Sequence, residues 1–346
     1  MAAPPTPELP IPPHFDPERV GEVWRVDYAS LAPAARSWRE RHAIPPAAGD
    51  EPRVCLLLVD VQNTFCIPDH ELFVGGRSGR GAVEDNVRLC RFVYRNLAAI
   101  TSIRATMDTH EALQIFHPAF WVGPEGEHPE PLTAIGVGDV ESGRWRVDPR
   151  VAAALGDAAG GDLDAYALHY VRRLAAADKY ELMIWPYHAM LGGLGHPLVS
   201  AVHEAMFFHG LVRSSPVHHE VKGDRALTEH YSALSPEVTH DQRGEPIAAA
   251  NRGFVETLLA YDRVAIAGQA KSHCLAWMIE DLLSDIRRRD PALARKVYLL
   301  EDCTSPVVIP GAVDFTEQAD RAFERFAAAG MHVVRSTDPI ADWPRP

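Results

Sequence analysis

The sequence lacks the features that mark several common classes of protein. It has five cysteines in 346 residues and no CxxC pair, so neither a disulfide framework nor a cysteine-based zinc site is expected, and a reducing cytoplasm is the simplest setting. No apolar run approaches the ~20 residues of a transmembrane helix. The first residues, MAAPPTPELPIPPHF, have neither the basic nor the apolar region of a secretory signal. We therefore expect a cytoplasmic protein.

Several catalytic and cofactor-binding motifs are also missing. There is no GxSxG nucleophile elbow, His203-Glu204 is not completed to HExxH, and no GxGxxG turn follows the first apolar run. The net charge is −13 with histidine neutral, which argues against a nucleic-acid groove or an anionic membrane surface as the main partner. The Arg287–Arg289 run is the main local exception, and it suits a solvated helix end.

Short apolar runs bounded by polar residues recur along the chain. Residues 54–60 (VCLLLVD) are the strongest example, and such a run is typical of a strand buried on both faces of a parallel sheet. The other predicted strands are 100–107, 263–268, 296–301, 331–335 and the shorter, more polar 218–222. Between them, apolar residues at helical spacing predict helices over 83–97, 275–286 and 315–326. This alternation predicts an α/β fold with a mainly parallel sheet.

The remaining segments do not fit a minimal α/β unit. Residues 1–50 are rich in Pro and Ala, and we expect an N-terminal arm with one short helix over 30–41, capped by Ser30. Residues 51–346 are expected to form a single domain, with insertions on the sheet's rim near 121–182 and 225–250. The arm and the insertions suggest self-association, so we expect a homo-oligomer.

Cys274 is the strongest candidate nucleophile. It follows a Gly-led turn after the strand 263–268 and begins an apolar helix. A thiol at a helix N-terminus lies near the positive end of the helix dipole and near free backbone N–H groups, and both favour the reactive thiolate. The same N–H groups can hold a developing oxyanion.

Two charged residues at strand ends are candidate partners of this thiol. Asp60 ends a strongly apolar strand, where an unpaired carboxylate would be costly, and Lys222 ends the strand 218–222. Ligands of open parallel sheets bind outside the carboxyl ends of the strands, so these side chains are expected to meet at one edge. An ammonium lowers the pKa of a nearby thiol, and a carboxylate can accept the thiol proton.

The segment Asp108-Thr109-His110 is a candidate metal site. Side chains alternate along extended backbone, so an Asp-x-His pair can offer a carboxylate and an imidazole on the same side to Zn²⁺ or a similar metal. A third ligand must come from elsewhere, and His188 and His117 are both candidates.

Five short segments acquire a joint meaning when they are taken in order. They are DVQNTF (60–65), TMDTH (106–110), WPYH (185–188), VKG (221–223) and AIAGQAKSHC (265–274). Together they resemble the isochorismatase-like cysteine hydrolases, and nicotinamidases most closely, with Thr64 in place of that family's usual second Asp. The resemblance covers about 54–110, 181–190, 218–224 and 263–335; the arm and the insertions lie outside it.

The resemblance implies a three-layer α/β/α fold with a six-stranded sheet, and a catalytic triad of Asp60, Lys222 and Cys274. It also implies an oxyanion hole at Ala270 and Cys274 with a cis peptide between Gln269 and Ala270. Phe65 and Trp185 would flank a flat substrate, and a divalent metal, zinc by preference, would be held by Asp108, His110 and His188. The implied function is hydrolysis of a small amide, nicotinamide by default, to an acid and ammonia.

Three other functions stay open at this point. The same fold could cleave a carbamoyl, ureido or other linear amide. A metal-bound water could be the nucleophile in place of the thiol. The chain could also bind a small molecule without catalysis. His117 could be an added metal ligand, and the sequence does not fix the substrate or the metal.

Overall fold

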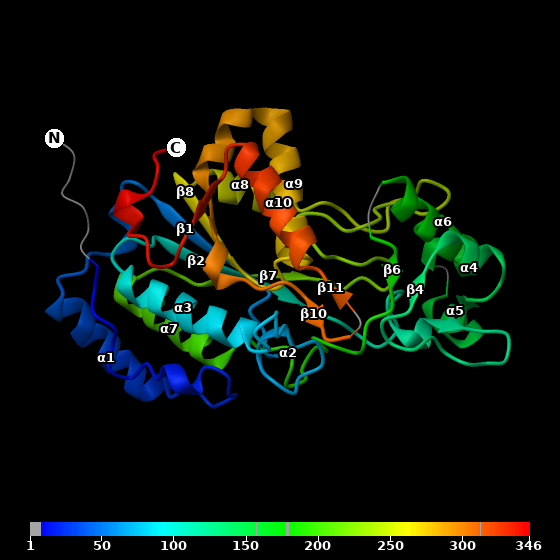
Figure 1. The fold of residues 1–346 in the computed structure, drawn as a ribbon, viewed down its shortest axis with the longest axis horizontal. Coiled ribbons are helices and arrows are strands. Elements are labelled where there is room, and N and C mark those ends of the chain that lie inside the picture. The colour runs from blue at the N-terminus through cyan, green and yellow to red at the C-terminus, as the bar shows by residue number, and fades with distance from the viewer. Residues whose placement is uncertain (1–7, 157, 178–179, 312) are drawn as a thin grey trace.

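A six-stranded parallel sheet forms the centre of the protein (Figure 1). The structure is a computed structural model, and it describes residues 8–156, 158–177, 180–311 and 313–346. Its strands run in the order β12-β9-β8-β1-β2-β7, and every neighbouring pair is parallel. The strands are β1 (Val54–Val59), β2 (Ser102–Asp108), β7 (His218–Lys222), β8 (Arg263–Gly268), β9 (Val297–Leu300) and β12 (His332–Val334).

Helices cover both faces of this sheet, and alternate side chains of the central strand β1 pack against the two sets of helices. Val54, Leu56 and Leu58 pack in the cluster that holds residues of α1, α3 and α7. The alternate residues of β1 face the helices α8, α9 and α10. The bounds are α1 (Tyr28–Arg41), α3 (Gly81–Arg95), α7 (Ser200–Arg213), α8 (Arg252–Leu259), α9 (Cys274–Arg289) and α10 (Thr316–Ala328). Burial on both faces explains why β1 is apolar throughout.

Smaller elements surround the carboxyl edge of the sheet. Between β2 and α7, a segment with its own apolar cluster lies beside the sheet (Figure 1). It contains α4 (Val137–Glu141), α5 (Pro149–Leu155), α6 (Leu163–Ala176) and the strands β3 (Trp121–Val122), β4 (Ala134–Ile135), β5 (Arg146–Val147) and β6 (Leu182–Met183). The short helix α2 (Asn63–Cys66) follows β1, and the hairpin of β10 (Val308–Ile309) and β11 (Val313–Asp314) precedes α10. The described residues also form 3-10 helices at Pro17–Arg19, Ala47–Gly49, Pro118–Phe120, Ala158–Gly161, Pro291–Lys296, Glu301–Cys303 and Ile340–Asp342.

The predicted α/β/α fold is confirmed, and all six predicted strands are present with ends shifted by at most two residues. The first helix begins earlier than predicted, because Asp27 and not Ser30 caps it: the Asp27 carboxylate accepts the backbone N–H of Ser30. The helix α7, which packs against α1 and α3, was not predicted. The run of three arginines forms the exposed last turn of α9, as expected.

The first seven residues of the predicted N-terminal arm lie outside the described residues. The remainder of the arm packs on the sheet's helices through α1. Its part in self-association, and the division of the chain into an arm and a single domain, stay predictions. In the part of the chain that the structure describes, no helix combines the length and apolar character needed to cross a bilayer.

Candidate active site

Three side chains at or beyond the ends of separate strands meet at the carboxyl edge of the sheet. Asp60 directly follows β1, Lys222 ends β7, and Cys274 begins α9 after the turn that follows β8. The Lys222 Nζ atom lies 3.0 Å from Asp60 Oδ2 and 3.7 Å from Cys274 Sγ. All three residues are buried. The structure therefore brings together the acid, the amine and the sulfur that were proposed from sequence.

Asp60 is held in place by the neighbouring strand. Its backbone adopts a φ of +48°, and its N–H donates to Thr106 Oγ1 at 3.0 Å. The Thr106 hydroxyl in turn donates to Asp60 Oδ1 at 2.5 Å. The other carboxylate oxygen is left facing Lys222. One threonine of β2 thus fixes both the backbone and the side chain of this aspartate.

The charge of Lys222 is maintained by two carboxylates that oppose the effect of burial on its pKa. Burial lowers the pKa of Lys222, but the carboxylates of Asp108 and Asp60 outweigh it and hold that pKa well above its usual value. Asp108 lies 2.8 Å from the ammonium on its other side. Burial raises the pKa of Asp60, partly opposed by Lys222. The ammonium is therefore firmly charged and is shared by two carboxylates.

The pKa of the Cys274 thiol is shifted in the direction opposite to the one expected from sequence. We expected the helix N-terminus and a nearby ammonium to favour the thiolate. Burial instead raises the pKa of the Cys274 thiol well above its ordinary value, and Lys222 only partly offsets this because Asp60 and Asp108 act in the opposite direction. Burial therefore favours the neutral thiol over the thiolate, and a base such as Asp60 must accept the proton when the sulfur reacts.

The turn before Cys274 is shaped by its backbone. Gly268 has a φ of +121°, and a Cβ atom there would lie 2.1 Å from the carbonyl oxygen of Val59. The peptide bond between Gln269 and Ala270 is cis. The Gln269 side chain donates to the buried carboxylate of Asp85 in α3 at 2.8 Å, which ties the turn to that helix.

Two backbone N–H groups of this turn, those of Ala270 and Cys274, are candidates for an anion site. The neighbouring His273 N–H and Leu275 N–H both donate to Ala270 O, at 3.0 and 3.3 Å. Within the described residues, the N–H groups of Ala270 and Cys274 have no such acceptor. Paired N–H groups without partners beside a nucleophile are suited to hold an oxyanion.

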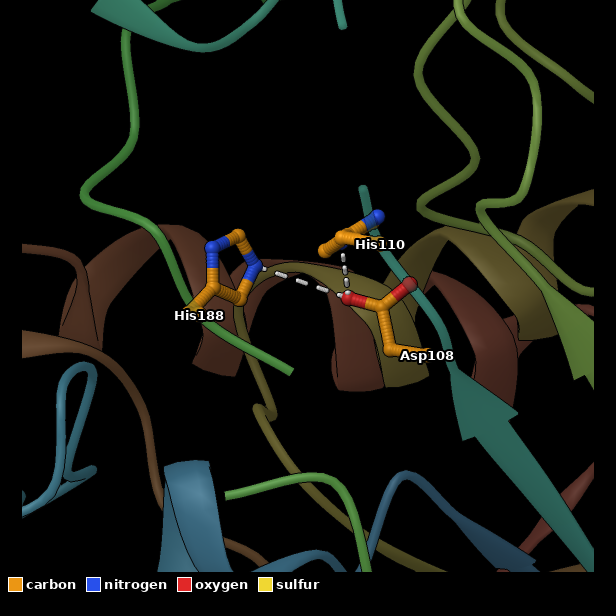
Figure 2. A group of neighbouring side chains, drawn as sticks. All are labelled: Asp108, His110 and His188. Atoms are coloured by element: carbon orange, nitrogen blue, oxygen red, sulfur yellow. Dashed lines mark hydrogen bonds and ion pairs between the residues drawn. The ribbon is translucent and has the colours of Figure 1, made fainter. Parts of the chain in front are cut away.

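A second cluster, of metal-ligand type, lies next to Lys222. Figure 2 shows the imidazoles of His110 and His188 directed at one carboxylate oxygen of Asp108. That oxygen lies 2.8 Å from His110 Nε2 and 3.6 Å from His188 Nε2. One ligand atom from each of the three residues lies within 4.8 Å of the others, as the sequence predicted for a metal site.

The hydrogen bonds of His188 test whether a metal fits here. Burial lowers the pKa of His188, which favours its neutral ring, whereas at His110 the Asp108 carboxylate outweighs burial and raises the pKa. The Nδ1 of His188 donates to Pro186 O at 2.8 Å, which leaves a lone pair on Nε2 facing the Asp108 carboxylate. Two lone pairs that face each other in a buried site are accommodated by a cation between them. The donor set therefore fits a divalent metal such as Zn²⁺.

His117 has the same arrangement. Its Nδ1 lies 2.9 Å from Glu111 O, and its buried Nε2 has no hydrogen-bond partner among the residues that the structure describes. Burial, with help from His188 and His110, lowers the pKa of His117 to about 3, so the free Nε2 carries a lone pair. The ring centre lies 5.8 Å from that of His110 and 6.1 Å from that of His188. The cluster whose ligand atoms all lie within 4.8 Å of one another does not include His117, so its role as an added ligand, which would be the third nitrogen donor, stays a prediction.

A cavity of about 280 Å³ opens onto both clusters. Its lining includes Cys274, Asp108 and His188, and also Phe65 and Trp185, the residues proposed to flank a flat substrate. The other lining residues are His70, Glu71, Leu72, Phe73, Val74, Glu229, Tyr231, Ala270, His273, Val307 and Ile309.

Sequence reasoning missed several polar residues of this cavity, among them Glu229 and Tyr231. Glu229 and Tyr231 follow β7 in a segment without regular structure. Tyr231 accepts a hydrogen bond from the Trp185 indole N–H at 3.2 Å, and burial raises the pKa of Glu229 to about 7. An acid in an aperiodic segment carries no local signal of burial, so only the tertiary structure reveals it.

Comparison with known proteins adds the fold. No described family's profile matches the chain, and no curated protein is significantly similar in sequence. The yeast nicotinamidase bound to the inhibitor nicotinaldehyde is 18% identical, with 82% of this chain and 99% of that chain covered and a TM-score of 0.50. This chain has the nicotinamidase fold. Nicotinamidases are isochorismatase-like cysteine hydrolases, and at this identity the likeness establishes the fold alone.

Two further solved nicotinamidase-fold structures give similar values. A nicotinamidase/pyrazinamidase of Acinetobacter baumanii is 18% identical, covering 83% of this chain and 98% of its own, with a TM-score of 0.49. The zinc complex of the Pyrococcus horikoshii pyrazinamidase is 16% identical, with coverages of 82% and 99% and a TM-score of 0.44.

One departure from the nicotinamidase-like sequence pattern has a structural counterpart. Thr64 stands where the pattern has its second Asp, and its hydroxyl donates to Glu71 Oε2 at 2.9 Å. Glu71 lines the cavity. A carboxylate is therefore present beside this position, but it comes from seven residues further along the chain.

Proposed function

We propose that the protein is a cysteine amidohydrolase that cleaves a small amide to an acid and ammonia through a thioester on Cys274. The observation that carries the proposal is the position of the Lys222 ammonium, 3.0 Å from Asp60 and 3.7 Å from Cys274, beside a cavity. Nicotinamide is the first substrate to test, because the similar yeast structure is named a nicotinamidase.

The first half of the reaction transfers the acyl group. As the Cys274 sulfur bonds to the amide carbon, its proton passes to the Asp60 carboxylate. The carbonyl oxygen becomes an oxyanion, which the N–H groups of Ala270 and Cys274 stabilise. Asp60 then returns the proton to the amide nitrogen, the C–N bond breaks, and ammonia leaves. Lys222 offsets the negative charge of the sulfur during these steps.

The second half restores the enzyme. A water molecule gives a proton to Asp60 and attacks the thioester carbon, with the oxyanion held as before. The C–S bond breaks, the sulfur regains a proton from Asp60, and the carboxylic acid departs. Phe65 and Trp185 would hold a flat acyl group between them throughout.

A divalent metal, with zinc favoured by the donor set, would be held by Asp108, His110 and His188, with His117 as a fourth donor. When bound, it would act as a Lewis acid toward a ring nitrogen of the substrate or a water. Asp108 would then bind both this metal and Lys222, which explains why the two clusters adjoin.

Ammonia release tests the proposal. The panel is nicotinamide, pyrazinamide, biuret and N-carbamoyl compounds, so that ring amides are compared with linear amides. Cys274→Ala should abolish release, whereas Cys90→Ala, which removes a buried thiol of α3 that does not line the cavity, should retain it. Release by Cys274→Ala at the wild-type rate would refute the thioester, and activity that survives thiol alkylation but not chelation would assign the reaction to metal-bound water.

A further inference from the structure

The cavity is larger than one aromatic ring requires. Its volume is about 280 Å³. An apolar cavity of about 150 Å³ is enough to hold benzene. A single-ring amide held between Phe65 and Trp185 would therefore leave a substantial part of this space to water.

The walls of the cavity differ in chemistry. Four lining residues have side chains that can bind or react with an amide: Cys274, Asp108, His188 and Glu229. A second set of five lining residues has only apolar side chains: Leu72, Phe73, Val74, Val307 and Ile309. His70 and Glu71 precede the first three, and Glu71 is exposed, so it lies where the apolar wall meets solvent.

The apolar wall is fixed to the catalytic elements by hydrogen bonds. Val74 N–H donates to Phe65 O at 2.8 Å, so the segment 72–74 runs beside α2. Val307 N–H donates to Ser272 Oγ at 3.1 Å, which places the start of the β10–β11 hairpin against the nucleophile turn. The two strips of apolar residues therefore line the same cavity.

We propose that the preferred substrate is a primary amide whose acyl group carries an apolar extension about the size of a second ring. The extension lies between the 72–74 segment and the hairpin residues Val307 and Ile309. Water against these five side chains has no polar partner, and an apolar group that displaces it gains the free energy of burial. This inference rests on the proposed amide hydrolysis and specifies its substrate class.

The test compares amides that differ only in the extension. Nicotinamide is measured beside its 5-phenyl and 6-phenyl derivatives, and benzamide beside its 3-phenyl and 4-phenyl derivatives. We expect the wild-type kcat/KM of at least one phenyl derivative to exceed that of its parent by tenfold or more, with most of the change in KM.

A filling substitution locates the extension. Ile309→Trp should lower the kcat/KM ratio of extended to parent amide at least tenfold. Val313→Trp is the matched control: Val313 pairs with Ile309 in the hairpin but does not line the cavity, so the ratio should stay within twofold of wild type. Val307→Phe gives an independent variant should Ile309→Trp fail to fold.

The outcomes separate this inference from the function on which it rests. If every parent amide is cleaved as well as its extended form, or if the filling variants leave the ratio unchanged, the extension site is wrong. If wild type cleaves no amide, the affinity of the same compounds, measured by calorimetry, tests the extension site separately from the hydrolysis. Tighter binding of the extended amides, lost in Ile309→Trp, would support the extension site and refute the hydrolysis; equal binding would refute the extension site as well.

Discussion

Thr106 offers a sharp test of how Asp60 is prepared for proton transfer. Its hydroxyl makes two hydrogen bonds to this one residue, accepting from the Asp60 N–H at 3.0 Å and donating to Oδ1 at 2.5 Å. Thr106→Val keeps the shape of the side chain and removes only these bonds. Since Thr106 and Asp60 are fully buried, water cannot replace the lost partner.

The expected magnitudes follow from these two bonds. A hydrogen bond to a charged group contributes about 1.5–3 kcal/mol, and a buried N–H left unsatisfied costs about 1–3 kcal/mol. We therefore expect Thr106→Val to lower the free energy of unfolding by about 3 kcal/mol. If half of this is also lost in the transition state, kcat/KM falls about tenfold.

The pH profile distinguishes positioning from simple destabilisation. The Thr106 hydrogen bond lowers the pKa of Asp60 against the effect of burial. Its removal raises that pKa further, so the carboxylate persists only at higher pH. The acid limb of kcat/KM should therefore move to higher pH in Thr106→Val. A merely structural role would leave the limb in place.

Thr106→Ser is the matched control, because it keeps the hydroxyl and loses a methyl group. Its acid limb should coincide with that of wild type, although its stability falls slightly. The reasoning is refuted if Thr106→Val shows wild-type kcat/KM and an unchanged acid limb while its unfolding free energy drops as expected. That result would mean that Asp60 does not take the proton, or that Thr106 does not orient it.

Three further perturbations act on neighbouring parts of the site. Lys222→Met leaves two buried carboxylates without their cation, so the free energy of unfolding measured by urea denaturation should fall by about 3–5 kcal/mol. Ammonia release should fall to background. Unchanged activity would exclude Lys222 from the chemistry. His117→Ala should lower the metal content retained after dialysis at least tenfold without loss of helicity, whereas the surface variant His169→Ala should retain it; equal content in both would exclude His117 as a ligand. Gly268→Ala places a Cβ 2.1 Å from Val59 O and should cost more than about 3 kcal/mol by the same denaturation measurement, with wild-type stability contradicting the turn geometry.

The sheet was predictable because its strands are buried on both faces. In β1 every residue is buried, which forces a continuous apolar run that sequence can reveal. The candidate nucleophile and its partners were predictable for a related reason. Parallel strands end at a common edge, so polar residues at the ends of β1, β7 and β8 had to lie near one another.

The electrostatics of the site could not be predicted in the same way. A helix N-terminus and a nearby ammonium favour a thiolate, and both are local features that sequence suggests. The opposing effects on Cys274, its burial and the second carboxylate at Asp108, come from long-range packing. The helix α7 was missed because most of its residues are buried, so it lacks the polar face that makes a helix pattern recognisable.

The unpredicted parts of the cavity have a common origin, and it bears on substrate choice. Glu229, Tyr231 and the segment 72–74 lie outside the sheet's strands and outside its covering helices, and Ile309 lies on a small hairpin. Loops of this kind vary without disturbing the sheet, while Asp60, Lys222 and Cys274 are fixed by strands that share one core. The two groups of residues can therefore change separately when the hydrogen bonds that join them are kept. Exchanging the β10–β11 hairpin while keeping Ser305 and Val307, whose backbone N–H groups donate to the nucleophile turn, should alter which amide is cleaved. Acylation of Cys274 by an accepted amide should persist, since Asp60 and Gln269 also have hydrogen-bond partners in β2 and α3.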